Sequence, residues 1–173
     1  LKSENMVKLP AIAYNRSSQT EVITDAIDLR QSLEAAAIQQ QEQGGRYIRP
    51  IVLFQAQPKT GEDATSFERL REKLVATGIP EAQIAIKTAN INELKGVDLL
   101  SPECEIRYII TVNALKEGWD CPFAYVLASL ANRTSQVDVE QILGRVLRQP
   151  HATRQRNQLL NMSYVLTSSN DFK

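Results

Sequence analysis

Three long polar side chains share one stripe of a helix expected between residues 136 and 148. Gln141, Arg145 and Arg148 stand at i, i+4 and i+7, a spacing that places them on one helical face. Guanidinium groups keep their charge and offer paired donors, so such a stripe could hold phosphate oxygens. On spacing alone, a solvated helix face is the simpler alternative. The apolar residues take the opposite side: Val139, Ile142, Leu143, Val146 and Leu147.

The identity of this string favours phosphate chemistry. Residues 141–148 read QILGRVLR and resemble motif VI, QxxGRxxR, of superfamily 2 helicases. The resemblance implies that Arg148 is an arginine finger on a nucleotide held by another domain, with Arg145 beside it on the phosphates. It also implies that Gln141 and Gly144 lie near the nucleotide. A glycine inside a helix costs about 1 kcal/mol relative to alanine, so close approach by another group at Gly144 is a reasonable compensation.

A second motif directly follows the β-branched segment 107–112. Residues 111–122 read TVNALKEGWDCP and resemble motif V of the same superfamily. The resemblance implies that Gly118 and Asp120 lie close to the nucleotide and that Asn113 is a nucleic-acid-binding or coupling residue. An ordinary strand-to-helix connection with a glycine turn is the alternative for this segment alone. The order of the two motifs along the chain matches the family.

Two further residues are candidates for nucleic-acid contact. Gln55 closes the apolar run that begins at Ile51, where motif IV would stand, although a plain core strand explains the run equally well. Thr88 follows Ile84–Ile86, and its hydroxyl is a plausible phosphate donor.

The elements that would position these residues alternate along the chain. Apolar periodicity predicts helices over 21–43 and 65–77, the second opening on a Thr65/Glu68 capping box. Apolar or β-branched runs predict strands at 51–54, 84–86, 107–112, 124–129 and 163–167. Strands separated by helices imply an α/β layer fold with a mostly parallel sheet. The helicase resemblance narrows this expectation to a three-layer RecA-like domain of the P-loop NTPase type.

Length and composition indicate one domain. The chain has 173 residues, 20 basic against 20 acidic side chains, and 43% hydrophobic content. We expect residues 1–173 to form a single domain, with 1–46 as a leading segment and helix, and to be a piece of a larger protein. Because the net charge is zero, any nucleic-acid contact must come from a local patch. One stretch is rich in arginine: Arg133, Arg145, Arg148, Arg154 and Arg156.

The remaining composition excludes several classes of protein. No apolar stretch is long enough to cross a membrane. Cys104, Cys121 and the single His151 do not form a zinc pattern, so we expect no metal site in this chain and a reduced, cytoplasmic setting.

Beyond the two motifs, the amino-acid sequence from Tyr47 to Thr167 resembles that of the Res subunit of type III restriction enzymes. That resemblance implies duplex DNA and a modification methyltransferase subunit as partners. The sequence has no GxxxxGK(S/T) loop and no DExx box, so ATP and Mg²⁺ would be held mainly by a first RecA-like domain of the same protein. An excision-repair type helicase and a non-catalytic RecA-like nucleic-acid-binding module are the alternatives.

Overall fold

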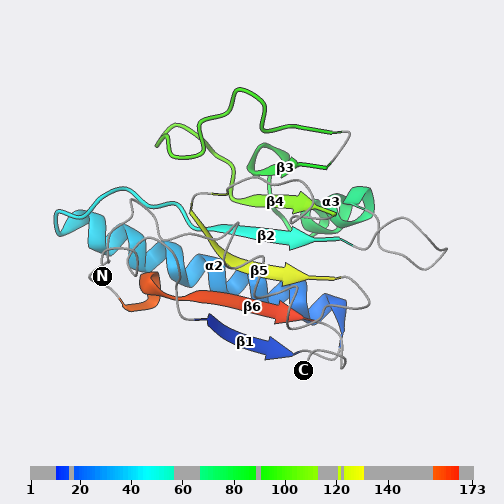
Figure 1. The fold of residues 1–173 in the computed structure, drawn as a ribbon, viewed down its shortest axis with the longest axis horizontal. Helices are drawn as coiled ribbons and strands as arrows, with labels where there is room; N and C mark the ends of the chain where they lie inside the picture. Colours follow the sequence, from blue (N-terminus) through cyan, green and yellow to red (C-terminus); the bar gives the residue numbers. More distant parts are fainter. Residues whose placement is uncertain are drawn as a thin grey trace, which may run out of the picture.

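The computed structural model describes the sheet of this protein and the helices on one of its faces (Figure 1). It describes residues 18–56, 67–88, 91–112, 121, 123–130 and 158–167, and the backbone of 11–15. The helix expected over 136–148 lies outside these residues. Of the expected capping box, Thr65 lies outside them and Glu68 is described.

Six strands form one sheet in the order β1-β6-β5-β2-β4-β3, and every neighbouring pair is parallel. The strands are β1 (Ala11–Asn15), β2 (Ile51–Gln55), β3 (Ile84–Ile86), β4 (Tyr108–Thr111), β5 (Ala124–Ser129) and β6 (Ser163–Thr167). All residues of β4 and β5 are buried, as are the first four of β2. Such continuous apolar runs suit strands that are covered on both faces, which explains why these three strands are central.

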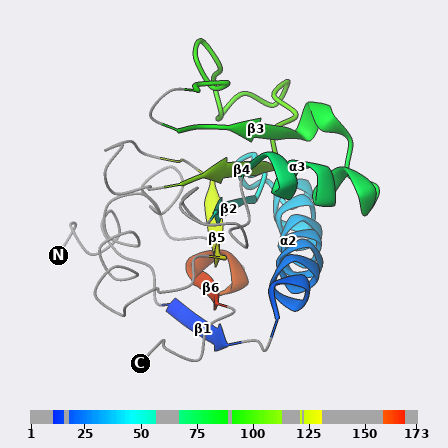
Figure 2. The same ribbon diagram turned by 90° about the vertical axis from the view of Figure 1, so that its right-hand side faces the viewer.

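Two helices pack on the same side of the sheet (Figure 2). They are α2 (Gln19–Glu42), between β1 and β2, and α3 (Phe67–Ala76), between β2 and β3. Both crossovers run in the same direction along the sheet, so right-handed connections place both helices on one face. Two short 3₁₀ helices precede β3 and β6: η1 (Glu81–Gln83) and η3 (Gln158–Asn161).

Local signals explain where each helix begins and ends. Ser18 caps α2, because its Oγ accepts a hydrogen bond from the Glu21 backbone N–H at 3.2 Å. After α2 the chain turns through Gly44, with φ +99°, and after α3 through Gly78, with φ +105°. The side chains of Leu70 and Leu74 are fully buried, and each contributes about 1.5–3 kcal/mol to stability.

The fold class is the one expected: an α/β fold with a parallel sheet flanked by helices, consistent with a three-layer RecA-like arrangement. The expected strands at 51–54, 84–86, 107–112, 124–129 and 163–167 are all present, three of them with the same bounds. The sequence did not predict β1, because a five-residue strand at the edge of a sheet has a short apolar pattern and pairs with β6, far along the chain. Within the described ranges, neither helix is long and apolar enough to cross a membrane.

Candidate functional site

The carboxyl ends of the strands meet at one edge of the sheet, where four neighbouring strands each end in a polar residue. In the order of the sheet these residues are Thr167, Ser129, Gln55 and Thr111. They are register partners, because Gln55 pairs with both Thr111 and Ser129, and Ser129 pairs with Thr167. Neighbouring strands lie about 4.8 Å apart, so the row spans roughly 15 Å. We call these four residues the polar row.

The polar row faces away from α2. Arg30 of α2 donates from Nε to the hydroxyl of Tyr108 at 3.1 Å, so Tyr108 points toward that helix. Successive side chains of a strand alternate between the two faces of the sheet, so Thr111, three residues later, points the other way. Its register partners point the same way as Thr111.

Burial differs along the polar row. Thr111, Ser129 and Thr167 are almost fully buried, whereas Gln55 is partly exposed. The Thr111 Oγ1 has no hydrogen-bond partner among the described residues. Leaving a buried hydroxyl unpaired costs about 1–3 kcal/mol. Such a group is therefore a candidate for pairing with a ligand when one is bound.

A second hydroxyl without a partner in the described part of the chain belongs to Tyr125, near the opposite end of β5. Burial raises the pKa of the Tyr125 phenol above its usual range, and the neighbouring Tyr164 raises it further. Tyr125 is therefore neutral and lies away from the carboxyl edge.

Backbone hydrogen bonds connect the three central strands where they end. The Ala56 N–H donates to the Thr111 carbonyl at 2.7 Å, and the Leu130 N–H donates to the Gln55 carbonyl at 2.8 Å. The side chain of Gln19, at the start of α2, donates to the Leu130 carbonyl at 3.1 Å. The points where the chain leaves β4 and β5 are thus fixed relative to β2.

The structure places the two described site candidates at this edge. Gln55 stands at its centre, between Thr111 and Ser129. Thr88 lies two residues beyond β3 and is 9% exposed. Its Oγ1 accepts a hydrogen bond from the Ile91 N–H at 3.0 Å, so this hydroxyl already supports a local turn. Contact of Thr88 with nucleic acid stays a prediction.

The other predicted site residues lie outside the described residues: Asn113, Gly118, Asp120, Gln141, Gly144, Arg145 and Arg148. The structure does place the ends of the strands that precede them. Asn113 comes two residues after Thr111, the end of β4. Leu130 directly follows the end of β5, and the segment with the motif VI resemblance starts eleven positions further along the sequence. These strand ends flank Gln55 and are about 10 Å apart.

Sequence reasoning gave no role to Thr111 or Gln19. Thr111 closes the strongest β-branched run of the chain, which is a usable signal because ligands of parallel sheets lie beyond such strand ends. Gln19 has no comparable signal, since its partner Leu130 is 111 residues away.

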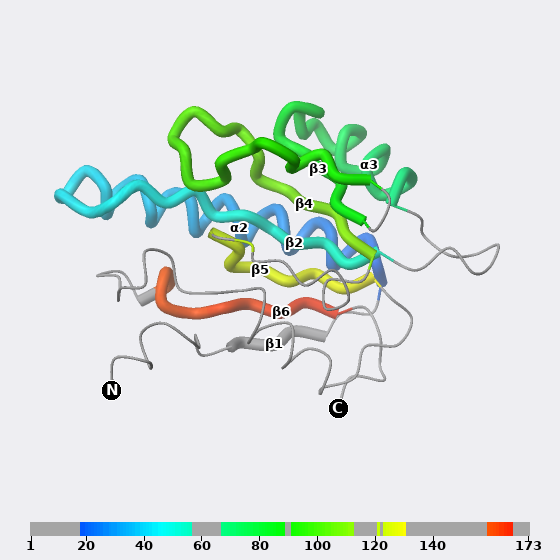
Figure 3. Tube along the Cα trace, turned by 45° about the horizontal axis from the view of Figure 1, so that its top comes forward, coloured from blue at the N-terminus to red at the C-terminus, as the bar shows by residue number. Residues whose placement is uncertain are grey.

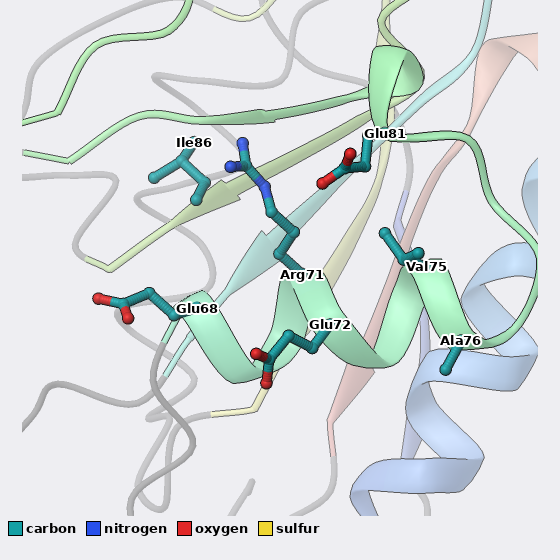
Figure 4. A pocket seen from close by; sticks show the side chains of 7 residues that line it. All are labelled: Glu68, Arg71, Glu72, Val75, Ala76, Glu81 and Ile86. Atoms are coloured by element: carbon teal, nitrogen blue, oxygen red, sulfur yellow. The ribbon is translucent and has the colours of Figure 1, made fainter.

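A groove of about 460 Å³ lies beside α3, η1 and β3 (Figure 4). It is lined by Glu68, Arg71, Glu72, Val75, Ala76, Glu81 and Ile86. Arg71 reaches from α3 toward Glu81 and Ile86 and forms an ion pair with Glu93. Of the two described candidates, neither Gln55 nor Thr88 lines this groove, although Ile86, the last residue of β3, does.

No metal centre is evident in the part of the chain that the structure describes, where no three His, Cys, Asp or Glu side chains are grouped to hold an ion. Comparison with protein-family models finds no match to this chain, and comparison with curated proteins finds none either.

Proposed function

We propose that this chain is the second RecA-like motor domain of a DNA-dependent ATPase. It supplies the motif V and motif VI residues to an ATP site completed by a first RecA-like domain of the same protein. More finely, we propose that the parent is the Res subunit of a cytoplasmic type III restriction enzyme. It would act on duplex DNA together with a modification methyltransferase subunit.

One observation carries the proposal. The two segments that resemble motifs V and VI follow β4 and β5, which flank β2 and end at the same edge of the sheet. Two unrelated connections in a sheet of this size could follow strands that are far apart. Here the strands that precede the two segments end beside each other at the carboxyl edge of the sheet. Ligands of open parallel sheets bind beyond this edge.

The chemistry follows from the side chains that these segments carry. Arg148 and Arg145 provide permanent charge and planar donors for phosphoryl oxygens, and such a finger is worth about 10³–10⁵ in turnover in nucleotide hydrolases. ATP with Mg²⁺ supplies the transferable phosphoryl group, and its phosphate cradle belongs to the first domain. Asp120 and Gly118 would line the same nucleotide from the β4 side.

The polar row offers neutral contacts for the nucleic acid. Gln55 is the partly exposed member of the row, and side-chain amides hydrogen-bond to the DNA backbone without reading its sequence. Asn113 would extend this surface, and Thr88 would stand at its end, near β3.

The decisive experiment measures ATP hydrolysis by the intact parent protein with and without duplex DNA at one stated salt concentration. We expect Arg148→Ala to lower DNA-stimulated turnover by roughly 10³-fold or more. Arg46→Ala is the matched control, because Arg46 is exposed and precedes β2 at the opposite end of the strand. Normal turnover in Arg148→Ala contradicts the assignment of the finger. Binding of DNA with no hydrolysis by the wild type would instead identify a non-catalytic RecA-like module.

A further inference from the structure

Acidic side chains line the groove beside α3. On that helix, Glu68, Glu72 and Val75 stand at i, i+4 and i+7 and therefore share one face. Glu81 of η1 adds a third carboxylate (Figure 4). Two elements thus bring three carboxylates to one groove of about 460 Å³.

The three carboxylates are not neutralised by neighbouring bases. Glu68, Glu72 and Glu81 are exposed, and none of them forms an ion pair with a described residue. Arg69 and Lys73 each follow one of these glutamates by one position, and one position turns a helix by about 100°. The bases of α3 next to these glutamates therefore point away from the groove face.

One base does line the groove, and its charge is already compensated. The guanidinium of Arg71 forms an ion pair with the Glu93 Oε1, which also accepts the Ile86 N–H at 2.8 Å. With Glu93 included, the groove has four glutamates against one arginine. The groove is thus locally acidic in a chain whose net charge is zero.

The groove also offers apolar contact. Val75 is 39% exposed, and Ala76 and Ile86 lie beside it in the lining. Lysine and arginine lay their apolar stems along such surfaces and keep the charged end near acids or water. The same carboxylates repel phosphate, so the groove suits a protein partner rather than nucleic acid.

The free edge of β3 beside the groove is already occupied. β3 is the last strand of the sheet, and an exposed edge strand can accept a strand from a partner. At Ile86, however, the N–H donates to the Glu93 carboxylate at 2.8 Å and the carbonyl accepts from the Glu93 N–H at 3.0 Å. The Ile84 N–H donates to the Glu81 carbonyl. A partner in the groove is therefore recognised by side-chain contacts and not by strand addition.

We propose that this groove docks a segment of a partner protein that carries basic and apolar side chains together. Its lysines or arginines pair with Glu68, Glu72 and Glu81, and its apolar side chains contact Val75. The inference goes beyond the proposed function and does not depend on it, because it uses no residue of the two motif segments.

The test measures binding of a short fluorescein-labelled peptide of alternating lysine and leucine to the intact protein by fluorescence anisotropy. We expect saturable binding that weakens as salt rises. Glu68→Gln/Glu72→Gln should raise the Kd by about 2- to 30-fold, the effect of losing two exposed ion pairs. Glu42→Gln/Glu103→Gln is the matched control, since it changes the net charge equally at two exposed positions outside the groove. The Kd of this control should stay that of the wild type.

A second pair of measurements tests the apolar contact and the location. Val75→Ser should weaken binding of the lysine–leucine peptide but not that of a lysine–serine peptide, because only leucine uses the valine. Ala76→Lys places a cation in the groove and should weaken binding of both peptides. Both positions are exposed, so the Tm of each variant should stay close to that of the wild type.

The outcomes separate docking in the groove from general attraction. Equal weakening in Glu68→Gln/Glu72→Gln and in Glu42→Gln/Glu103→Gln shows attraction to any acidic surface and overturns the proposal. So does wild-type affinity in both the Glu68→Gln/Glu72→Gln and the Ala76→Lys variants. Equal binding of a glutamate–leucine peptide shows that charge is not recognised and overturns it as well.

Discussion

At the scale of single residues, the carboxylate of Glu34 in α2 contacts two arginines. It pairs with Arg30 at 2.5 Å and accepts from the Nε of Arg107 at 3.4 Å. Burial raises the pKa of Glu34, but the hydrogen bond and charge of Arg30, and then those of Arg107, outweigh it and hold the pKa below its usual range. The folded state thus favours the ionised carboxylate.

This shift predicts how stability depends on pH. Because the folded pKa is lower than the unfolded value of about 4.3, Glu34 contributes stability above the unfolded pKa and loses it as pH falls through the folded pKa. We expect Glu34→Gln to lower the free energy of unfolding by about 1–2 kcal/mol at pH 7, and the difference from wild type to shrink below about pH 4. Urea unfolding at both pH values measures it. Glu42→Gln, an exposed change in the same helix, is the control, and an equal difference at both pH values contradicts the prediction.

Phe123 combines a strained backbone with a buried ring. Its φ is 70°, in the left-handed region that bulky residues avoid. The ring is fully buried, 6.0 Å from Tyr47 and 5.7 Å from the Arg49 guanidinium. Packing therefore holds the backbone in this conformation directly after the motif V segment.

Two substitutions separate packing from strain. Phe123→Ala removes the ring at a cost of about 3–5 kcal/mol and leaves the strain in place. Phe123→Gly removes the ring and also relieves the strain, which is worth about 1–2 kcal/mol. We expect the glycine variant to be more stable than the alanine variant by about 1 kcal/mol in urea unfolding, the reverse of the usual order in strands and helices. An alanine variant of equal or higher stability would show that the left-handed conformation is not retained.

At the scale of elements, one arginine supports the connection between β3 and β4. Figure 3 traces the backbone of this connection above the sheet. Arg49, just before β2, is 1% exposed and donates to the carbonyls of Leu99 at 2.5 Å, Ser101 at 3.0 Å and Ile106 at 2.7 Å. Within this connection, the side chain of Leu99 is buried but that of Leu100 is exposed. Apolar burial is therefore only part of what holds the connection to the sheet, and the hydrogen bonds of Arg49 add to it.

Loss of the Arg49 guanidinium should free this connection. Arg49→Met removes the donor to three carbonyls. The Ser101 carbonyl still accepts from the Cys104 N–H, whereas those of Leu99 and Ile106 lose the guanidinium at about 1–3 kcal/mol each, so we expect the free energy of unfolding to fall by at least about 2 kcal/mol. Backbone amides of residues 99–106 should lose hydrogen-exchange protection before those of β4. Arg49→Lys should be intermediate, because an ammonium lacks the planar fork of a guanidinium. Arg46→Met, at an exposed position, is the control, and unchanged protection in Arg49→Met refutes the role.

The elements were largely predictable from sequence, whereas the contacts between them were not. The apolar runs of β5 and β6 gave their bounds directly, because local side-chain periodicity determines them. Arg30 sits on the apolar stripe of α2, and its burial could have been suspected from that position. Gln19 and Arg49 act on residues 111 and more than 50 positions away, and no local pattern carries such information. Gln55 was placed correctly at a strand end, but its neighbours Thr111 and Ser129 follow only from the topology.

At the scale of the whole molecule, the sheet places polar groups where ligands of this fold class bind, and it leaves one of them unpaired. The Thr111 hydroxyl is buried and has no hydrogen-bond partner among the described residues, so it does not stabilise the fold there. Native proteins tolerate such a cost mostly at functional sites, where stability and activity oppose each other.

Thr111→Val therefore predicts effects of opposite sign on stability and activity. The substitution keeps the shape and removes the unpaired hydroxyl, so we expect the free energy of unfolding to rise by up to about 1 kcal/mol. In the intact protein, DNA-stimulated ATP hydrolysis should fall about tenfold, because one hydrogen bond of about 1.4 kcal/mol is lost at the carboxyl edge. Thr77→Val is the matched control: its hydroxyl donates to the Leu74 carbonyl at 2.7 Å, so that variant should lose stability and keep its activity. A Thr111→Val variant that is destabilised has lost a structural hydrogen bond, and one that is stabilised but fully active removes Thr111 from the site.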